Sequence, residues 1–340
     1  MDMSLNLHQN NGNGNMPVLT NDKQRVLFTH FDLDGVGCEI IMKKAFAFKH
    51  RYCMGYPKFR ERIKKKDYLG YDSCFITDLS LTQDQYNEIK GVYSNRMVWI
   101  DHHQSSLSVE KQIGDTNSII DISRSGTAIC AFSFQKLINF NAISRFIVGV
   151  DAYDMWRWRT HPKEFSYGYD LNTLFWYYGY FQFYDAFCDN PSRQFTNTEK
   201  AIIKNSMEEK KKMILAATKE RFGEKSMVII GAHDSVVNDF SLTYPNIDLF
   251  YIINTDKDSF SVSIRSNKEG TAIGTHLRVL KDNYSDMIHT AGGHSMSGGM
   301  GFNKNSTMNN VLDIIEELDY YITGKANDSF ESPSDDDIPF

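Results

Sequence analysis

The fold of this chain is decided by one stretch, Arg25-Val26-Leu27-Phe28-Thr29-His30-Phe31-Asp32-Leu33-Asp34-Gly35. Its first five residues form a short apolar run typical of a buried strand, and residues 37–48 after it predict a helix. Alternate residues of an extended segment face the same side, so His30, Asp32 and Asp34 can converge on one site. Taken alone, the motif is equally compatible with a solvated loop that ends in an N-capping aspartate.

Two further apolar runs end in an acid. Residues 74–77 and 97–100 predict strands, and Asp78 and Asp101 follow them directly. Helical segments lie between or after these runs, which indicates parallel βαβ units. In an open α/β sheet, ligands bind beyond the carboxyl ends of the strands, so the three strand ends point to one crevice. An aspartate at a strand end, such as Asp78, is also common as the start of a turn.

Adjacent histidines strengthen the case for a metal site. Asp101-His102-His103 places two imidazoles and a carboxylate at the same sheet edge, where one histidine can bind a metal and the other can bind or protonate a substrate. A structural histidine pair is the alternative. Carboxylates with a few imidazoles suit divalent manganese or magnesium, and the absence of cysteine from these motifs argues against zinc.

The second half of the chain has a different pattern. An aromatic-rich segment, residues 171–187, precedes a long polar helix and a second set of predicted strands. For the aromatic segment we favour packing in the core or at a domain interface over stacking with bases. Ser125-Gly126-Thr127 predicts a helix cap, with a phosphate contact as the alternative.

We therefore expect an α/β protein with a doubly wound, mainly parallel N-terminal domain, a helical linker and a smaller C-terminal α/β domain. The expected ranges are 1–22 (disordered), 23–195 (catalytic domain), 196–222 (connector helix), 223–324 (second domain) and 325–340 (disordered acidic tail).

Composition limits the possible partners. The net charge of −6 comes mostly from the last fourteen residues, and the near-neutral body lacks the basic excess of a protein that grips long duplex DNA. No run of about 18 apolar residues predicts a membrane span. The N-terminus does not have the pattern of a secretory signal. Five scattered cysteines fit thiols in a reducing cytoplasm, so we expect a cytoplasmic protein with no membrane partner.

These motifs resemble, in order and context, those of the DHH phosphoesterases, of the RecJ-like exonuclease and oligoribonuclease type. The N-terminal match is carried by His30-x-Asp32-x-Asp34-Gly35, Asp78, Asp101-His102-His103 and Asp151. Gly292-Gly293-His294, the following Gly298–Phe302 and the strand Phe260–Ser266 resemble the DHH-associated C-terminal domain. The resemblance extends from about Val26 to Phe302.

The resemblance implies a site for two divalent ions, manganese preferred and magnesium possible. The implied ligands are His30, Asp32 and Asp78 for one ion, and Asp34, Asp78, His102 and Asp151 for the other, with Asp78 bridging. The implied catalytic residues are Asp101, which supports the imidazoles, and His103, near the scissile phosphate. The implied substrate-binding residues of the second domain are Arg265, Gly292, Gly293 and His294.

The chain ends in Asp335-Asp336-Asp337-Ile338-Pro339-Phe340. Composition alone indicates a disordered acidic tail. The ending also resembles the C-terminal tip of bacterial single-stranded DNA-binding proteins. That resemblance implies that the terminal Phe340 docks on repair and replication enzymes.

Together these features predict a metal-dependent phosphodiesterase or exonuclease that hydrolyses single-stranded nucleic acid or short oligonucleotides by a two-metal mechanism. One alternative is the hydrolysis of a cyclic dinucleotide or a nucleoside bisphosphate. The other is an inactive DHH scaffold, which the intact set of clustered carboxylates disfavours because such a cluster is costly to retain.

Overall fold

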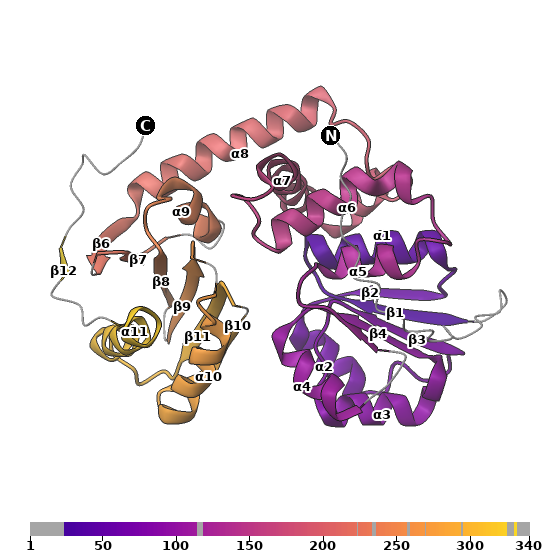
Figure 1. Cartoon of the computed structure of the whole chain (residues 1–340), viewed down its shortest axis with the longest axis horizontal. Helices are drawn as coiled ribbons and strands as arrows, with labels where there is room; N and C mark the ends of the chain where they lie inside the picture. The colour runs from indigo at the N-terminus through magenta and orange to yellow at the C-terminus, as the bar shows by residue number, and fades with distance from the viewer. Residues whose placement is uncertain are drawn as a thin grey trace. The chain divides into compact units, whose positions relative to one another are not determined.

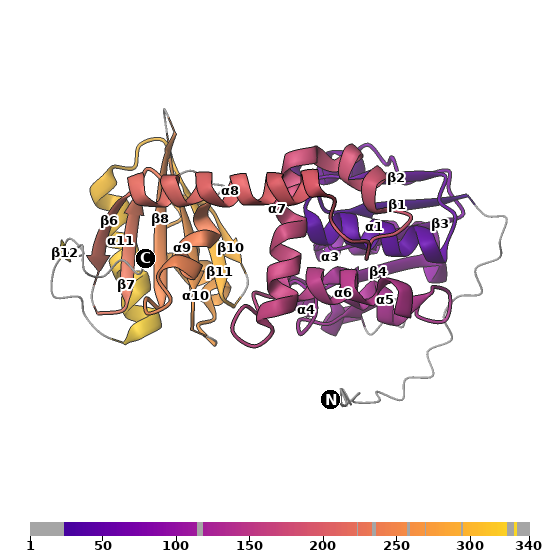
Figure 2. The same ribbon diagram turned by 90° about the horizontal axis from the view of Figure 1, so that it is seen from above.

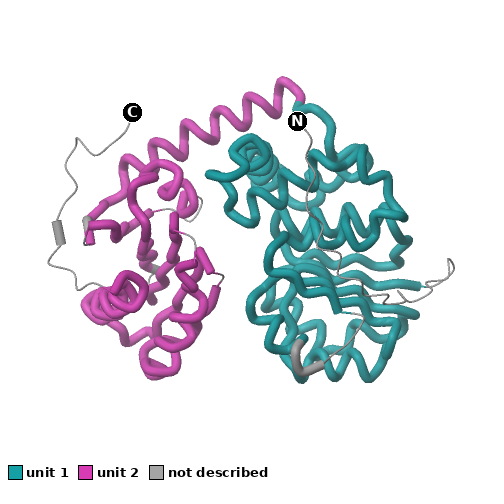
Figure 3. Tube along the Cα trace, in the orientation of Figure 1, with its two compact units in different colours: residues 1–195 teal, residues 196–340 magenta. Residues whose placement is uncertain are grey.

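A computed structural model describes residues 24–113, 118–222, 224–232, 236–256, 259–268, 270–293, 295–324 and 330–331. The chain divides between Phe195 and Thr196 into two compact units (Figure 3). We describe each unit by itself.

Unit 1 is built on a sheet of five strands in the order β2-β1-β3-β4-β5, and all of its pairs are parallel, as the sequence predicts. The apolar runs predict three of the five strands. The strands are β1 (Arg25–Thr29), β2 (His50–Cys53), β3 (Ser73–Thr77), β4 (Met97–Asp101) and β5 (Ser118–Ile120). Every residue of β1, β3 and β4 is buried, which is typical of parallel strands covered on both faces.

Helices cover both faces of this sheet (Figure 1). On one face Phe28, Ile76 and Trp99 pack against α2 (Tyr56–Lys64), α3 (Gln83–Tyr93) and α4 (Gln104–Ile113). On the other face the alternate residues Leu27, Phe75 and Val98 pack against α1 (Leu33–Ala45), α5 (Gly126–Ser133) and α6 (Phe140–Asp154). The doubly wound arrangement expected from the sequence is therefore confirmed, because neighbouring residues of each strand supply opposite layers of core.

The aromatic-rich segment, residues 171–187, is the C-terminal two thirds of a long helix, α7 (Pro162–Phe187), which packs on α6. The two helices approach closely because both carry glycine at the contact: a Cβ added to Gly168 would lie 2.0 Å from the carbonyl oxygen of Gly149. Helix α7 is interrupted at Gly179, whose φ of 71° and ψ of 170° are non-helical. Figures 1 and 2 show α6 and α7 side by side.

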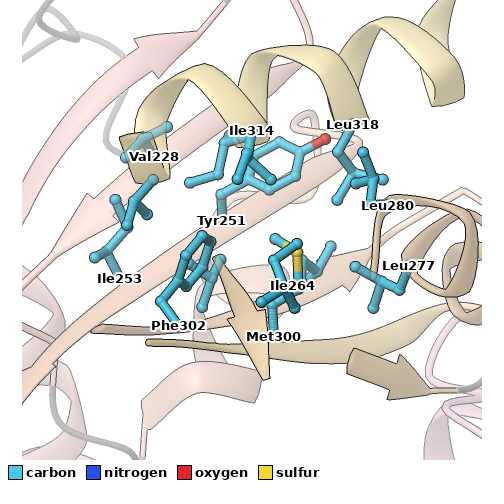
Figure 4. Close-up of a cluster of buried hydrophobic side chains, with 14 of the residues drawn as sticks. Val228, Tyr251, Ile253, Ile264, Leu277, Leu280, Met300, Phe302, Ile314 and Leu318 are labelled. Carbon is cyan, nitrogen blue, oxygen red and sulfur yellow. The ribbon is translucent and has the colours of Figure 1, made fainter. Parts of the chain in front are cut away.

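Unit 2 contains a mixed sheet of seven strands in the order β10-β11-β9-β8-β7-β6-β12. Its elements are α8 (Asn197–Ala216), β6 (Thr218–Phe222), β7 (Ser226–Ile230), α9 (Val237–Thr243), β8 (Leu249–Asp256), β9 (Ser259–Ser266), α10 (Ile273–Asn283), β10 (Ile288–Gly293), β11 (Ser297–Phe302), α11 (Met308–Thr323) and β12 (Phe330–Glu331). Helices α10 and α11 cover one face, where their apolar side chains pack on those of the strands to form the core shown in Figure 4. Helix α9 and the end of α8 cover the other face.

The connector helix is shorter than the sequence suggests. Helix α8 ends at Ala216, and residues 218–222 pair antiparallel with β7 instead of continuing the helix. The edge of β7 offers backbone hydrogen bonds, and Phe222 is buried in the core of unit 2. In the described part of the chain, no helix has the length and apolar character needed to cross a bilayer.

Candidate metal centre

The loop after β1 holds His30 and Asp32 together. Asp32 is the N-cap of α1: its Oδ1 accepts the Gly35 N–H at 2.8 Å, while His30 Nδ1 lies 2.6 Å from its Oδ2. Burial alone would raise the pKa of Asp32, but the charge and hydrogen bond of His30 and the Gly35 N–H outweigh it and lower the pKa to about 2. Only glycine fits at position 35, because a Cβ there would lie 2.0 Å from the His30 carbonyl oxygen.

Asp78 lies at the centre of the cluster. It follows β3 with a positive φ of 54°, and it is almost fully buried. Its Oδ1 lies 3.2 Å from His102 Nε2, and its Oδ2 lies 4.0 Å from His30 Nδ1. Burial, followed by repulsion from the carboxylates of Asp32 and Asp34, raises the pKa of Asp78 well above its usual range.

Asp101 faces the two histidines from the end of β4. Its Oδ1 lies 2.7 Å from His103 Nδ1, and its Oδ2 accepts hydrogen bonds from the hydroxyls of Ser80 and Ser106. Burial raises the pKa of Asp101, but the neighbouring His103 outweighs burial and holds the pKa below the usual range. Both oxygens are thus occupied by hydrogen bonds, as expected of a residue that orients an imidazole.

Asp34 is held by the start of α5. Its Oδ2 accepts the Gly126 N–H at 2.7 Å and its Oδ1 the Thr127 N–H at 2.9 Å, while His102 Nε2 lies 3.8 Å from Oδ2. The hydroxyl of Ser125 caps the helix by accepting the N–H of Ala128. Because Asp34 receives the first N–H groups of α5, this terminus serves the cluster rather than an incoming phosphate.

Helix α6 carries two acids one turn apart, and they have different surroundings. Asp151, the expected ligand, accepts the Ser125 N–H at 2.8 Å and is ion-paired with Arg157. Asp154 instead lies with its Oδ2 3.6 Å from His102 Nε2. Sequence reasoning missed Asp154. The available signal was a second acid three residues after Asp151, since residues at that spacing share a face when the segment is helical.

Three groups of side chains place their donor atoms within 4.8 Å of one another: Asp78, Asp101, His102 and His103; His30, Asp32 and Asp78; and Asp34, His102 and Asp154. The structure thus brings together every expected ligand except Asp151, and it adds Asp154 to the set.

The chemistry of this donor set fits divalent cations. Asp78 Oδ2 and Asp154 Oδ2 are buried atoms without a hydrogen-bond partner among the described residues. Burial and the neighbouring carboxylates, Asp34 first, also raise the pKa of Asp154 well above its usual range. Crowded carboxylates with imidazole nitrogens beside them are the ligands of manganese and magnesium sites. A bound cation would compensate the negative charge that the folded chain places here.

The expected substrate-binding residues of unit 2 lie on neighbouring strands. Arg265 in β9 donates from Nε to Asn238 Oδ1 at 2.5 Å and from Nη1 to the carbonyl oxygen of Gly298 at 3.4 Å. Gly292 and Gly293 in β10 pair with the opposite strand β11, of which Gly298 is part. Arg265 and the glycine hairpin therefore form one surface within unit 2. His294, the remaining expected substrate-binding residue, lies outside the described residues. The acidic ending Asp335–Phe340, expected to bind a partner protein, also lies outside them.

Comparison with known proteins gives related folds. No protein-family profile matches the chain. It is 28% identical over 165 residues to the oligoribonuclease NrnB of Bacillus subtilis, an alignment that covers 44% of this chain and 40% of NrnB. The chain thus spans less than half the length of this curated relative.

Two solved structures are similar over most of the chain. The DHH domain of a protein from a family of ribosomal proteins has a TM-score of 0.60 and 13% identity, covering 87% of this chain and 86% of that one. The pGpG-specific phosphodiesterase PggH from Vibrio cholerae has a TM-score of 0.51 and 13% identity, covering 89% and 99%. At this identity the likeness is one of fold.

Proposed function

We propose that this chain, which has the fold of the DHH-domain proteins, is a metal-dependent phosphodiesterase acting on single-stranded nucleic acid or short oligonucleotides. The observation that carries the proposal is the buried Asp78, on which the segments after β1, β3 and β4 converge. A carboxylate so placed, with one oxygen lacking a hydrogen bond within the described chain, suits a shared ligand of two cations.

The residues that would hold the metals follow from the grouping of donors. His30, Asp32 and Asp78 would hold one ion, and Asp34, Asp78, His102 and Asp154 the other. Manganese is preferred because imidazole nitrogens accompany the carboxylates, and magnesium is possible. When bound, such a pair of ions supplies a nucleophilic water at neutral pH and neutralises charge on the phosphoryl oxygens.

His103 and Asp101 act together at the phosphate. The contact of 2.7 Å between His103 Nδ1 and Asp101 Oδ1 orients the ring. A protonated His103 would donate to a phosphate oxygen or to the leaving alkoxide as the P–O bond breaks. Asp101 is a positioning residue in this scheme, since its other oxygen is occupied by Ser80 and Ser106.

In unit 2, Arg265 and the amides near Gly292 and Gly293 would bind a phosphate or a base of a nucleotide substrate. The contact between Arg265 Nε and Asn238 keeps the guanidinium in one place beside the glycine hairpin. His294 belongs to the same proposal on sequence grounds.

Short, unpaired strands are the preferred substrate because the body of the chain is near neutral and its composition lacks the basic excess of a protein that grips long duplex DNA. The likeness in fold to a phosphodiesterase whose name specifies pGpG supports including dinucleotides among the substrates. Cyclic dinucleotides and nucleoside bisphosphates remain the second candidate class. The intact cluster of carboxylates and histidines supports an enzyme over an inactive scaffold.

The test is hydrolysis with Mn²⁺. The substrates are end-labelled single-stranded DNA, an RNA dinucleotide, a cyclic dinucleotide and a nucleoside bisphosphate. We expect turnover of the first two. Asp78→Asn should abolish it, and Asp101→Ala should lower kcat. Asp84→Asn, a change in the exposed first turn of α3, is the control. Turnover that survives Asp78→Asn, or no turnover of any substrate, would remove the proposal.

The acidic ending suggests a protein partner. We propose that Asp335–Phe340 recruits proteins that bind the tip of single-stranded DNA-binding protein, on the sequence resemblance alone. Deleting residues 338–340 should abolish binding to such a receptor and leave hydrolysis unchanged. Equal binding by the full chain and the deletion variant would refute this.

A further inference from the structure

An exposed aromatic surface begins inside the metal-binding motif. Phe31 lies between His30 and Asp32 in the chain, and its ring centroid is 6.3 Å from that of Trp176 and 6.3 Å from that of Tyr180. Tyr180 in turn contacts Phe181 edge-on at 4.9 Å. We call these four residues, Phe31, Trp176, Tyr180 and Phe181, the aromatic surface.

The aromatic surface is not part of the core. Trp176 is 60% exposed, Phe181 79% and Phe31 38%. The same helix, α7, buries other aromatic rings, Phe175, Phe183 and Phe187, so the packing predicted for this segment accounts for only some of its rings. Large apolar rings that are exposed next to one another are a feature of binding surfaces.

The aromatic surface rests on a fixed support. The hydroxyl of Tyr180 donates to Glu39 at 2.7 Å from one oxygen and 2.9 Å from the other, and Glu39 is fully buried. Arg51 Nη1 lies 2.7 Å from the same carboxylate, and the Arg51 guanidinium covers the ring of Tyr184 at 4.7 Å. A ring held this way loses little conformational entropy when a ligand stacks on it.

Positive charge flanks the rings. Lys43 Nζ lies 5.2 Å from the centre of the Tyr184 ring, and Tyr184 in turn contacts Tyr180 at 6.1 Å. Lys43 is itself an exposed side chain. Aromatic faces beside cations are the combination with which proteins bind single strands, because every unpaired base offers a π-face and every link a phosphate.

We propose that the aromatic surface stacks unpaired bases of the strand whose phosphate is hydrolysed. This inference rests on the proposed function and adds how that site selects its substrate. The occupant is an unpaired nucleic-acid strand because exposed rings lie beside the positive charge of Lys43. Phe31 also follows His30 and precedes Asp32 in the chain, so the surface starts in the loop that carries two of the proposed metal ligands. Paired bases present no free faces, and the surface therefore discriminates against duplex.

The experiment compares a labelled single-stranded oligonucleotide with an abasic strand of the same length and backbone. Trp176→Ala and Phe181→Ala should each raise KM for the base-bearing strand by about 5- to 100-fold, with kcat within about 2-fold of the wild type. Neither change should alter KM for the abasic strand. Trp176→Phe should restore most of the lost affinity, because it retains an aromatic face.

Tyr177→Ala is the matched control. Tyr177 is 64% exposed on the same helix, and its ring packs edge-on against Tyr178 instead of Phe31. This variant should keep the wild-type KM. Unchanged KM in both Trp176→Ala and Phe181→Ala would overturn the inference.

Binding separates this inference from the proposed function. If the wild type hydrolyses no strand, the proposed function fails. The affinity of the protein for the same two strands is then measured by fluorescence anisotropy with Ca²⁺ present, and it tests stacking without hydrolysis. Tighter binding of the base-bearing strand, weakened by Trp176→Ala, supports the inference on its own. Equal binding of both strands overturns it. The inference is also overturned if Trp176→Ala changes the sedimentation coefficient of the protein without changing its affinity for either strand. That result would assign the aromatic surface to contact with a second copy of this chain.

Discussion

The carboxylate of Asp34 closes the N-terminus of helix α5, where its Oδ2 accepts the N–H of Gly126 at 2.7 Å. The helix therefore places its positive end on a carboxylate that other acids repel. This single contact connects two segments 92 residues apart and makes α5 part of the support of the metal centre.

Gly126→Ala should weaken Mn²⁺ binding without unfolding the protein. A Cβ at this position would lie 3.0 Å from Asp34 Oδ2 and 3.1 Å from the Cβ of Asp78, so both acids must shift by a few tenths of an ångström. We expect a loss of about 3- to 10-fold in metal affinity or kcat, measured by titration calorimetry and kinetics. Gly91→Ala in α3, where a Cβ meets open space, is the control. Equal effects of the two changes would contradict this.

Asp154 and Asp151 should differ as ligands. Asp154→Asn removes an oxygen 3.6 Å from His102 Nε2, whereas Asp151→Asn removes a partner of Ser125 and Arg157. We expect Asp154→Asn to lower Mn²⁺ affinity by more than about 100-fold. Asp151→Asn should stay within the roughly 10- to 100-fold loss typical of residues that only support ligands. The reverse order in calorimetry would return Asp151 to the ligand set.

Asp78→Asn should change stability in opposite directions with and without metal. In EDTA the wild type holds a buried carboxylate among repelling neighbours, so removing its charge should raise the Tm. With Mn²⁺ the wild type gains the binding energy of the ions, and the variant loses most of it. Each kcal/mol corresponds to about 2–4 °C in a thermal melt of a domain of this size. A variant that is less stable in both conditions would argue against charge crowding.

Asp170 should make stability depend on pH. Burial raises its pKa to about 6, so the folded state binds this proton more tightly than the unfolded chain does. The resulting stability is complete below the unfolded pKa of about 4 and is lost as pH rises through about 6. Asp170→Asn should therefore leave the Tm unchanged near pH 4 and stabilise the protein by about 1–2 kcal/mol near pH 8, since the side chain is partly exposed.

The control for Asp170 is Asp185→Asn, an exposed position on the same helix, which should not change the profile. A stabilisation by Asp170→Asn that is equal at both pH values would show that the effect is one of packing instead of ionisation.

The parallel sheet was predictable because each of its central strands contains an apolar run with an acid or a histidine at or directly after its end. β1, β3 and β4 lie where the apolar runs predict, and they bring His30, Asp78 and Asp101 to one edge. The strand β2 has no such run: His50–Cys53 is only partly buried, so its sequence carries little periodic signal.

Other features depend on packing that a sequence does not specify. The choice between Asp151 and Asp154 depends on the rotation of α6 about its axis, which its contact with α7 through Gly149 and Gly168 helps to set. The end of α8 at Ala216 depends on the edge of β7, a neighbour formed only in the folded unit. Tertiary contacts override local helix preference at such places.

The backbone conformation of Asp78 destabilises the folded protein at this site. With φ at +54°, the residue occupies a conformation that glycine or asparagine adopts more easily, and its charge is crowded as well. Both replacements would relieve strain while removing a proposed metal ligand. A laboratory selection that rewarded thermal stability alone should therefore replace the carboxylate at position 78 early, because stability and the proposed chemistry oppose each other at this residue.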